Sequence, residues 1–194
     1  MAELSLLLLG LDVAGSVLDR IPSSRRLMNI ESSAFEQMFD QVHDVWLVIP
    51  VDLSALGVTA AFGGLGLVHQ SNGQTPALSR SWNRLYVQLG AAKGNFTVIA
   101  RTWTRIGDIN DNPDIFAYMG YGDLTGTYRW HGHEFSGLVR QNFATRRGAV
   151  QASWAFPVVT NLKGYVQLFS GYGQSLIDYN ASQTTIGLGA LVGF

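Results

Sequence analysis

Apolar and polar residues alternate one by one along most of the chain from Gly63 onward, and this alternation limits the fold more than any other feature. In one segment, for example, Val150 and Trp154 alternate with Gln151 and Ser153. Successive side chains of a β-strand point to opposite faces, so such segments predict strands with one apolar face. Eight segments have this pattern: residues 63–71, 80–91, 95–106, 115–130, 133–144, 147–159, 162–173 and 183–194.

The connections between these segments alternate in length. The longer ones are residues 72–79, 107–114 and 174–182, the tight ones are residues 92–94, 131–132 and 160–161, and residues 145–146 break the pattern. Long loops at one end and short turns at the other are typical of bacterial outer-membrane barrels. A soluble lipid-binding barrel, the alternative, has no reason for this difference. We therefore predict an all-β fold: an antiparallel transmembrane β-barrel, crossing the bacterial outer membrane several times.

The first third of the chain lacks this alternation and predicts a separate, atypical N-terminal segment over residues 1–62, followed by the barrel region over residues 63–194. The sequence from Ser33 to Glu36 fits a helix capping box, and Phe39, Val42 and Trp46 follow at helical spacing. These features favour a helix or a poorly ordered leader. Residues 45–53 fit a strand as the alternative.

Composition excludes several classes of function. The chain has 13 Lys and Arg against 14 Asp and Glu, so its charge gives no reason to expect a nucleic acid partner. It has no cysteine, which excludes disulfide bonds and cysteine-ligated metals. No run of 18 or more apolar residues predicts a membrane-spanning helix.

Three polar residues lie at odd-numbered positions of two neighbouring predicted strands, on the same face as the apolar residues of those strands. His69 and Ser71 follow Leu65 and Leu67 on odd positions, and Asn83 precedes further apolar odd positions in the next strand. A hairpin whose loop centres on Pro76 pairs residues whose numbers sum to 152, which sets His69 opposite Asn83 and Ser71 opposite Ser81. Opposed Cβ atoms are about 4.5–5.5 Å apart. One hairpin therefore brings a hydroxyl, an imidazole and a carboxamide together on the face predicted to meet lipid.

These three groups match the requirements of nucleophilic catalysis. A serine hydroxyl becomes a good nucleophile when an imidazole takes its proton, and a third group must orient the imidazole. We predict Ser71 as nucleophile, His69 as base and Asn83 as the orienting group, with backbone N–H groups at Asn72-Gly73 forming an oxyanion hole. The alternative is an ordinary set of polar residues at the aqueous rim of the membrane.

The amino-acid sequence around these residues resembles that of one known family. The matching segments are His69-Gln70-Ser71-Asn72-Gly73, Ser79-Arg80-Ser81-Trp82-Asn83-Arg84-Leu85-Tyr86, Asp111-Asn112-Pro113-Asp114-Ile115, Tyr118-Met119-Gly120-Tyr121 and Ser170–Asn180. They resemble outer membrane phospholipase A over about residues 63–194. The resemblance implies calcium-dependent hydrolysis of phospholipid acyl esters by a homodimer in the outer membrane, and the roles given above for Ser71, His69 and Asn83.

By the same resemblance, calcium is bound by the Ser79 side chain and the Gln74 carbonyl, with water and the partner subunit completing the site. The family barrel has twelve strands, and this chain matches the last eight. A truncated or degenerate outer-membrane protein without catalysis is therefore the alternative function.

Two further groups of residues are best explained by structural roles and not by catalysis. The acidic loop around Asp111, which includes Asp108, Asn112 and Asp114, fits a solvated external loop, with Asp111 as a secondary calcium contact in the alternative. Six aromatic residues fit an interfacial girdle: Tyr118, Tyr121, Tyr128, Trp130, Trp154 and Tyr172.

Overall fold

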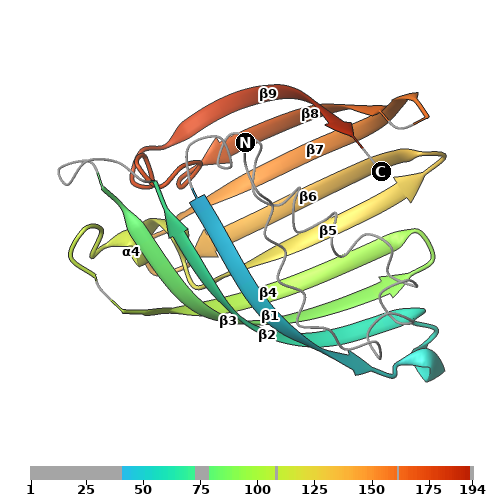
Figure 1. Ribbon diagram of the computed structural model, residues 1–194, viewed down its shortest axis with the longest axis horizontal. Helices are drawn as coiled ribbons and strands as arrows, with labels where there is room; N and C mark the ends of the chain where they lie inside the picture. The colour runs from blue at the N-terminus through green and yellow to red at the C-terminus, as the bar shows by residue number, and fades with distance from the viewer. Residues whose placement is uncertain (1–40, 73–78, 108, 161, 193–194) are drawn as a thin grey trace.

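The computed structural model describes residues 41–72, 79–107, 109–160 and 162–192. These residues form nine strands, one short α-helix and one 3₁₀ turn (Figure 1). The strands are β1 (Gln41–Val51), β2 (Ala60–Ser71), β3 (Ser81–Lys93), β4 (Phe96–Ile106), β5 (Gly122–Trp130), β6 (His133–Asn142), β7 (Arg147–Val159), β8 (Leu162–Gly171) and β9 (Gln183–Val192). The 3₁₀ turn is η1 (Ser54–Leu56), and the helix is α4 (Ile115–Met119).

Each strand pairs antiparallel with the next strand along the chain, in the order β1 to β9. The sheet is strongly curved, with the longer loops and α4 at one end and the short turns at the other (Figure 1). The β5–β6 turn has two residues, His131 and Gly132, both with positive φ (46° and 82°), as a type I′ hairpin turn requires. Within the described ranges no helix is long and apolar enough to cross a membrane.

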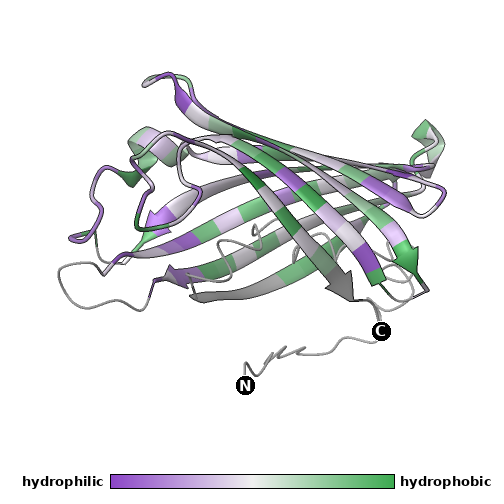
Figure 2. Cartoon of the chain, turned by 90° about the horizontal axis from the view of Figure 1, so that it is seen from above, coloured by the Kyte–Doolittle hydropathy of each residue, from purple (hydrophilic) through white to green (hydrophobic). Residues whose placement is uncertain are grey.

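The apolar side chains of the sheet face outward. Leu65, Leu67 and Val87 are 47–50% exposed, and hydrophilic and hydrophobic residues alternate along the strands in Figure 2. The other exposed large apolar side chains of the strands include Leu47, Ile49, Leu89, Val98, Leu124, Val139, Val150, Leu168, Ile186 and Leu188. Such a face is stable where the surrounding medium is hydrocarbon, as it is for an outer-membrane protein.

The polar side chains of the same strands face inward and bind one another. Arg101 forms an ion pair with Asp123 at 2.8 Å, and the Gln167 side-chain amide donates a hydrogen bond to Gln151 at 3.1 Å. Buried polar groups are tolerated when they are hydrogen-bonded. The inward face of the sheet can therefore be polar along most of the length of the strands. The polarity is the reverse of a soluble barrel, and the soluble alternative is disfavoured.

The structure corrects the predicted elements at two places. Residues 41–51 form strand β1, so the helical prediction for Val42 and Trp46 is wrong, and the strand alternative for 45–53 is the better one. The predicted boundary between residues 62 and 63 falls inside β2, because the sheet includes β1 and the start of β2. Residues 1–40, with the capping box at Ser33, lie outside the described residues.

The second correction concerns the segment 115–130, which was predicted as a single strand. It forms α4 and then β5, because Ile115 and Met119 turn inward and are buried against aromatic side chains of β3 and β4.

A charge on the outward face should destabilise the protein in a membrane. Val87 lies in the middle of β3, and Val87→Arg should lower the free energy of unfolding by about 2–4 kcal/mol, the usual cost of Arg on the lipid face at mid-depth. Leu56→Arg is the matched control, since Leu56 is 70% exposed but lies in a connection between strands. Urea unfolding of the protein in phospholipid vesicles measures both, and equal losses would contradict an outward lipid face.

Candidate active site

The hairpin of β2 and β3 places the predicted catalytic residues at its loop end. His69 lies directly opposite Asn83, and Ser71 lies opposite Ser81. The register predicted from the loop centre is therefore confirmed. The chain forms this hairpin without a shift in pairing from Ala60 to Ser71, so the positions of the two strands relative to each other are fixed along their whole length.

All three residues lie on the outward face. His69 is exposed and follows the exposed Leu65 and Leu67 at intervals of two residues, while Ser71 and Asn83 are half-buried. A polar group on a lipid-facing surface without partners costs free energy, so these groups are expected to bind one another.

His69 and Asn83 are joined by a hydrogen bond. The distance between His69 Nδ1 and Asn83 Oδ1 is 2.5 Å. With Asn83 presenting its carbonyl oxygen, Nδ1 carries the hydrogen and donates it, and Nε2 is the basic nitrogen of the neutral ring. Ser71 is the next residue on the same face of β2, about 7 Å further along the strand. The arrangement can therefore supply an oriented base beside a hydroxyl.

The inward side of the same hairpin is held by Arg84. Its guanidinium lies 4.1 Å from the ring centre of Trp82 and 5.5 Å from that of Trp103, and it donates a hydrogen bond to Gln70 at 3.1 Å. Arg84 follows Asn83 in β3, and Gln70 follows His69 in β2. The contact between Arg84 and Gln70 therefore ties the two strands together directly behind the His69–Asn83 pair.

A buried apolar cluster supports this inner layer. Trp82 is fully buried and meets Trp103 and Phe116 edge to face, with ring centres 6.0 and 6.1 Å apart. The cluster joins β2, β3 and β4 to α4 and to the loop after β8; its buried members are Val68, Trp82, Tyr86, Trp103, Ile115, Met119, Leu176 and Tyr179. Burial of large aromatic side chains dominates core energetics, so this cluster is the rigid base of the hairpin.

The base of the β2–β3 loop is closed by Asn72 and Arg80. The Asn72 N–H donates to the Arg80 carbonyl at 3.1 Å, and the Arg80 N–H donates to the Asn72 side chain at 2.9 Å. Sequence reasoning predicted the Asn72 N–H as an oxyanion donor, but this N–H donates to the Arg80 carbonyl instead. It did not predict roles for Gln70 or Arg84. Their inward parity next to the predicted catalytic residues was a signal, but it does not identify a partner.

The predicted calcium ligands are only partly described. Ser79 is half-buried, and Asp111 is exposed. Gly73, the predicted oxyanion residue, and Gln74, the predicted carbonyl ligand, lie outside the described residues. Across the part of the chain that the structure describes, no three His, Cys, Asp or Glu side chains gather into a metal site. The donors that are present are oxygens of a hydroxyl and a carboxylate, which suit calcium chemically.

The loop around Asp111 is less solvated than predicted. Asn112 is fully buried, and its side-chain and backbone oxygens accept hydrogen bonds from Arg105. Asp114 accepts a hydrogen bond from the Tyr179 hydroxyl at 2.5 Å. The solvated-loop prediction is therefore wrong for Asn112, which anchors the loop, whereas Asp111 and Asp114 are both exposed.

Four of the six residues predicted to form an aromatic girdle have the exposed side chains that a girdle requires. Tyr121, Tyr128, Trp130 and Trp154 are 40–58% exposed. Tyr118 and Tyr172 instead pack near each other, with ring centres 5.3 Å apart, and the Arg147 guanidinium lies over the Tyr118 ring at 4.4 Å. The girdle assignment is wrong for these two, because α4 and the loop after β8 turn them toward the loop-end cluster.

The contact between Tyr179 and Asp114 predicts sensitivity to alkali. Burial, together with the hydrogen bond to Asp114, raises the pKa of Tyr179 to about 12 from its ordinary value of 10.0. A raised pKa in the folded state means that the stabilisation is complete below about pH 10 and is lost as the pH rises through about 12. The stability difference between the wild type and Tyr179→Phe should be constant up to pH 10 and shrink between pH 10 and 12.

Thermal unfolding in detergent, followed at each pH, measures this difference. Tyr128→Phe removes a hydroxyl from the outward face and is the control. The same pH dependence in both variants would contradict a role for the Tyr179–Asp114 contact.

Comparisons with known proteins were made for both sequence and structure. A family model described as Phospholipase A1 matches residues 26–192. The phospholipase A1 of Salmonella typhimurium is 38% identical over 162 residues, which is 84% of this chain and 56% of that protein.

Solved structures give the same result. The outer membrane phospholipase A of Escherichia coli, solved also as an active-site variant with alanine in place of asparagine, has a TM-score of 0.75 and 35% identity over 79% of this chain and 60% of that chain. A calcium-bound dimer of the outer membrane phospholipase of Salmonella typhi has a TM-score of 0.74 and 37% identity, with the same coverage. The predicted fold class and outer-membrane location are confirmed. The chain spans between 35% and 60% of the length of the relatives that it matches.

Proposed function

The chain belongs to the phospholipase A1 family, and from this premise we propose that it hydrolyses acyl ester bonds of phospholipids in the outer membrane, with Ser71, His69 and Asn83 as its catalytic residues. The observation that carries the proposal is the 2.5 Å contact between His69 Nδ1 and Asn83 Oδ1, on the outward face beside Ser71. The E. coli relative supports it, since an asparagine belongs to the active site of that protein.

The proposed reaction begins with proton transfer from Ser71 to His69. The Ser71 hydroxyl gives its proton to His69 Nε2 while Oγ attacks the carbonyl carbon of the ester, and a tetrahedral intermediate forms. His69 then gives this proton to the departing alcohol oxygen, and the acyl group stays on Ser71. Water, activated by the same imidazole, hydrolyses the acyl-serine and restores the free hydroxyl.

Asn83 acts on the base in this proposal. Its side-chain oxygen fixes the His69 tautomer and ring orientation, as the carboxylate does in a Ser-His-Asp triad. A neutral amide does this without placing a second charge next to lipid, where an unpaired carboxylate would be costly. The location fits the substrate as well, because the face that bears these residues is the apolar outward face, which phospholipids can reach directly from the membrane.

We include calcium and a second subunit in the proposal, because the Salmonella typhi relative is a calcium-bound dimer. Ser79, the Gln74 carbonyl and Asp111 would hold the ion, and water and the partner subunit would complete the six to eight oxygens that calcium requires. When bound, calcium would supply positive charge that stabilises the oxyanion. The Gly73 backbone N–H is the proposed second source of stabilisation.

Removal of the Ser71 hydroxyl tests the catalytic proposal. Ser71→Ala should lower hydrolysis of a phospholipid in mixed micelles by at least about 10³-fold, because the nucleophile is lost. Asn83→Ala should cost less, since it disturbs the base without removing it. Ser170→Ala is the control: Ser170 is an exposed serine near the loop end of β8, bonded to Thr184 at 3.0 Å. Undiminished hydrolysis by a folded Ser71→Ala protein would eliminate the proposal.

Calcium dependence is tested separately. Ser79→Ala should raise the calcium concentration that gives half-maximal hydrolysis on the order of tenfold or more, since one ligand is removed. Asp111→Asn should have a smaller effect. Activity that persists in excess EDTA would exclude the calcium role, and a folded wild-type chain without any hydrolysis would favour the non-catalytic alternative.

A further inference from the structure

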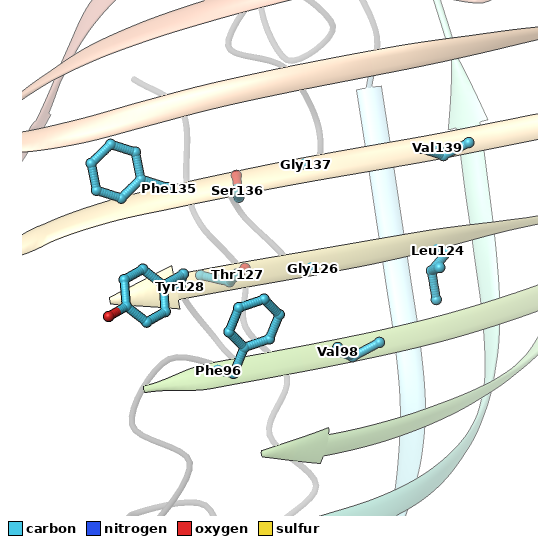
Figure 3. Close-up of a pocket in the computed structure, with 10 residues that line it drawn as sticks. All are labelled: Phe96, Val98, Leu124, Gly126, Thr127, Tyr128, Phe135, Ser136, Gly137 and Val139. Carbon is cyan, nitrogen blue, oxygen red and sulfur yellow. The ribbon is translucent and has the colours of Figure 1, made fainter. Parts of the chain in front are cut away.

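A hollow lies in the outward face of β4, β5 and β6, away from the catalytic hairpin. Its volume is about 440 Å³, and its floor is formed by Gly126 of β5 and Gly137 of β6, which are directly paired (Figure 3). A methyl group placed on Gly126 would meet no atom within 4 Å, and one on Gly137 would meet only the Gln151 carbonyl oxygen at 3.8 Å. The space is therefore open because two neighbouring strands both lack a side chain at the same level.

Two rows of side chains that run across the strands form the walls of this hollow, which we call the trench. On the side of the short turns, Phe96, Tyr128 and Phe135 are paired in register, and the rings of Phe96 and Tyr128 are 5.7 Å apart. On the other side Leu124 is paired with Val139. Figure 3 shows the aromatic side chains on one side of the glycines and the aliphatic ones on the other. The walls are apolar apart from the Tyr128 hydroxyl.

The medium around the trench is lipid, because the trench is part of the apolar outward face of an outer-membrane fold. Its wall residues Phe96, Leu124 and Val139 are 51–53% exposed. An empty hollow loses dispersion contacts on every side. Hydrocarbon chains of the surrounding lipid are the material available to fill it, and its volume lies in the range of about 300–1,000 Å³ that is usual for small-ligand sites. We propose that the trench binds one acyl chain of a membrane phospholipid.

The polar end of that lipid would pass over the row of Phe96, Tyr128 and Phe135 and lie at the short-turn rim. Gly137 is four residues from His133 at the start of β6, or about 13 Å along the strand, which is within one leaflet of a hydrocarbon core about 30 Å thick. His133 Nδ1 accepts a hydrogen bond from the Trp154 indole N–H at 3.1 Å. The neutral ring therefore carries its hydrogen on Nε2, which can donate to an ester or phosphate oxygen. Short turns face the periplasm, where the leaflet consists of phospholipid.

A second copy of the chain fits the trench less well. Symmetric dimers place the same surface of each subunit against the other. A symmetric contact centred on Gly126 and Gly137 would set one hollow against another and leave both unfilled. The trench is also distinct from the proposed catalytic site, since Phe96 begins β4 at the short-turn end whereas Ser71 ends β2 at the long-loop end.

Photo-crosslinking to a lipid tests this proposal. The probe is a phosphatidylcholine with a diazirine in the middle of one acyl chain, added in trace amounts to dioleoylphosphatidylcholine vesicles that contain the wild-type protein. After illumination, mass spectrometry should find adducts at Leu124, Phe135 and Val139 at least about fivefold more often than at Ile186 and Leu188, which are outward residues of β9. Equal labelling of both groups would overturn the proposal, and this comparison needs no variant.

Filling the trench provides the second measurement. Gly126→Leu combined with Gly137→Leu should lower trench labelling about fivefold, while hydrolysis stays at the wild-type level. Gly63→Leu is the matched control, because Gly63 also lies on the outward face, and a methyl group placed there would meet Leu89 only at an ordinary contact distance of 3.8 Å. Unchanged trench labelling in a folded double variant would contradict the proposal, as would protein–protein adducts at the trench accompanied by a larger oligomer.

Failure of this proposal and failure of the catalytic proposal can be told apart. Trench labelling should be the same in Ser71→Ala as in the wild type, because the bound chain is not a substrate. Labelling that disappears in Ser71→Ala would assign the adducts to the catalytic site instead.

Discussion

The structure depends on one constraint: backbone N–H and C=O groups cannot be left unpaired in hydrocarbon. Each such group costs several kcal/mol in lipid, so membrane-crossing segments must pair within helices or within a sheet. In this chain β2 to β8 are each hydrogen-bonded on both sides. Strand pairing in turn imposes the two-residue period that sends apolar side chains outward and polar ones inward. The interior can then hold ion pairs such as Arg101–Asp123. In an apolar core the desolvation of such charges would be costly.

The catalytic proposal uses both faces of a single hairpin. Outward residues of β2 and β3 are the proposed catalytic residues, and their inward neighbours hold the two strands in place. On the inward face the Arg84 guanidinium ties β2 to β3, since it lies over Trp82 and binds Gln70 directly behind the His69–Asn83 pair. Because α4 and the loop after β8 pack on Trp82 and Trp103, segments far from Ser71 in sequence contribute to the stiffness of the hairpin. Preorganised catalytic groups require such support, since small displacements cost much of the rate.

Sequence reasoning predicted what depends on period and symmetry. The strands from β2 onward, the polarity of the two faces and the pairing of His69 with Asn83 follow from alternation and loop position alone. β1 was predicted poorly, because Val42 and Trp46 are four residues apart, a spacing that fits one face of a helix and also one face of a strand. The helix α4 was missed because Ile115, Ala117 and Met119 alternate like a strand. Only tertiary burial of Ile115 and Met119 makes these five residues helical, and no local pattern reveals that. The hydrogen-bond partners of Arg84 and Asn112 could not be predicted for the same reason, since they come from other strands and loops.

Along β2 the proposed catalytic residues alternate with inward supporting residues, so the register of the hairpin determines whether the proposed site can form. A slip of β2 against β3 by one residue would turn His69 and Ser71 into the interior and expose Val68 and Gln70 to lipid. It would also bring Gln70 out of reach of Arg84 and expose a polar amide to hydrocarbon. The misaligned chain would be both unstable and chemically inert. Correct alignment is therefore a condition for the proposed activity, since the proposed lipid-facing active site can assemble only in molecules with the native strand register.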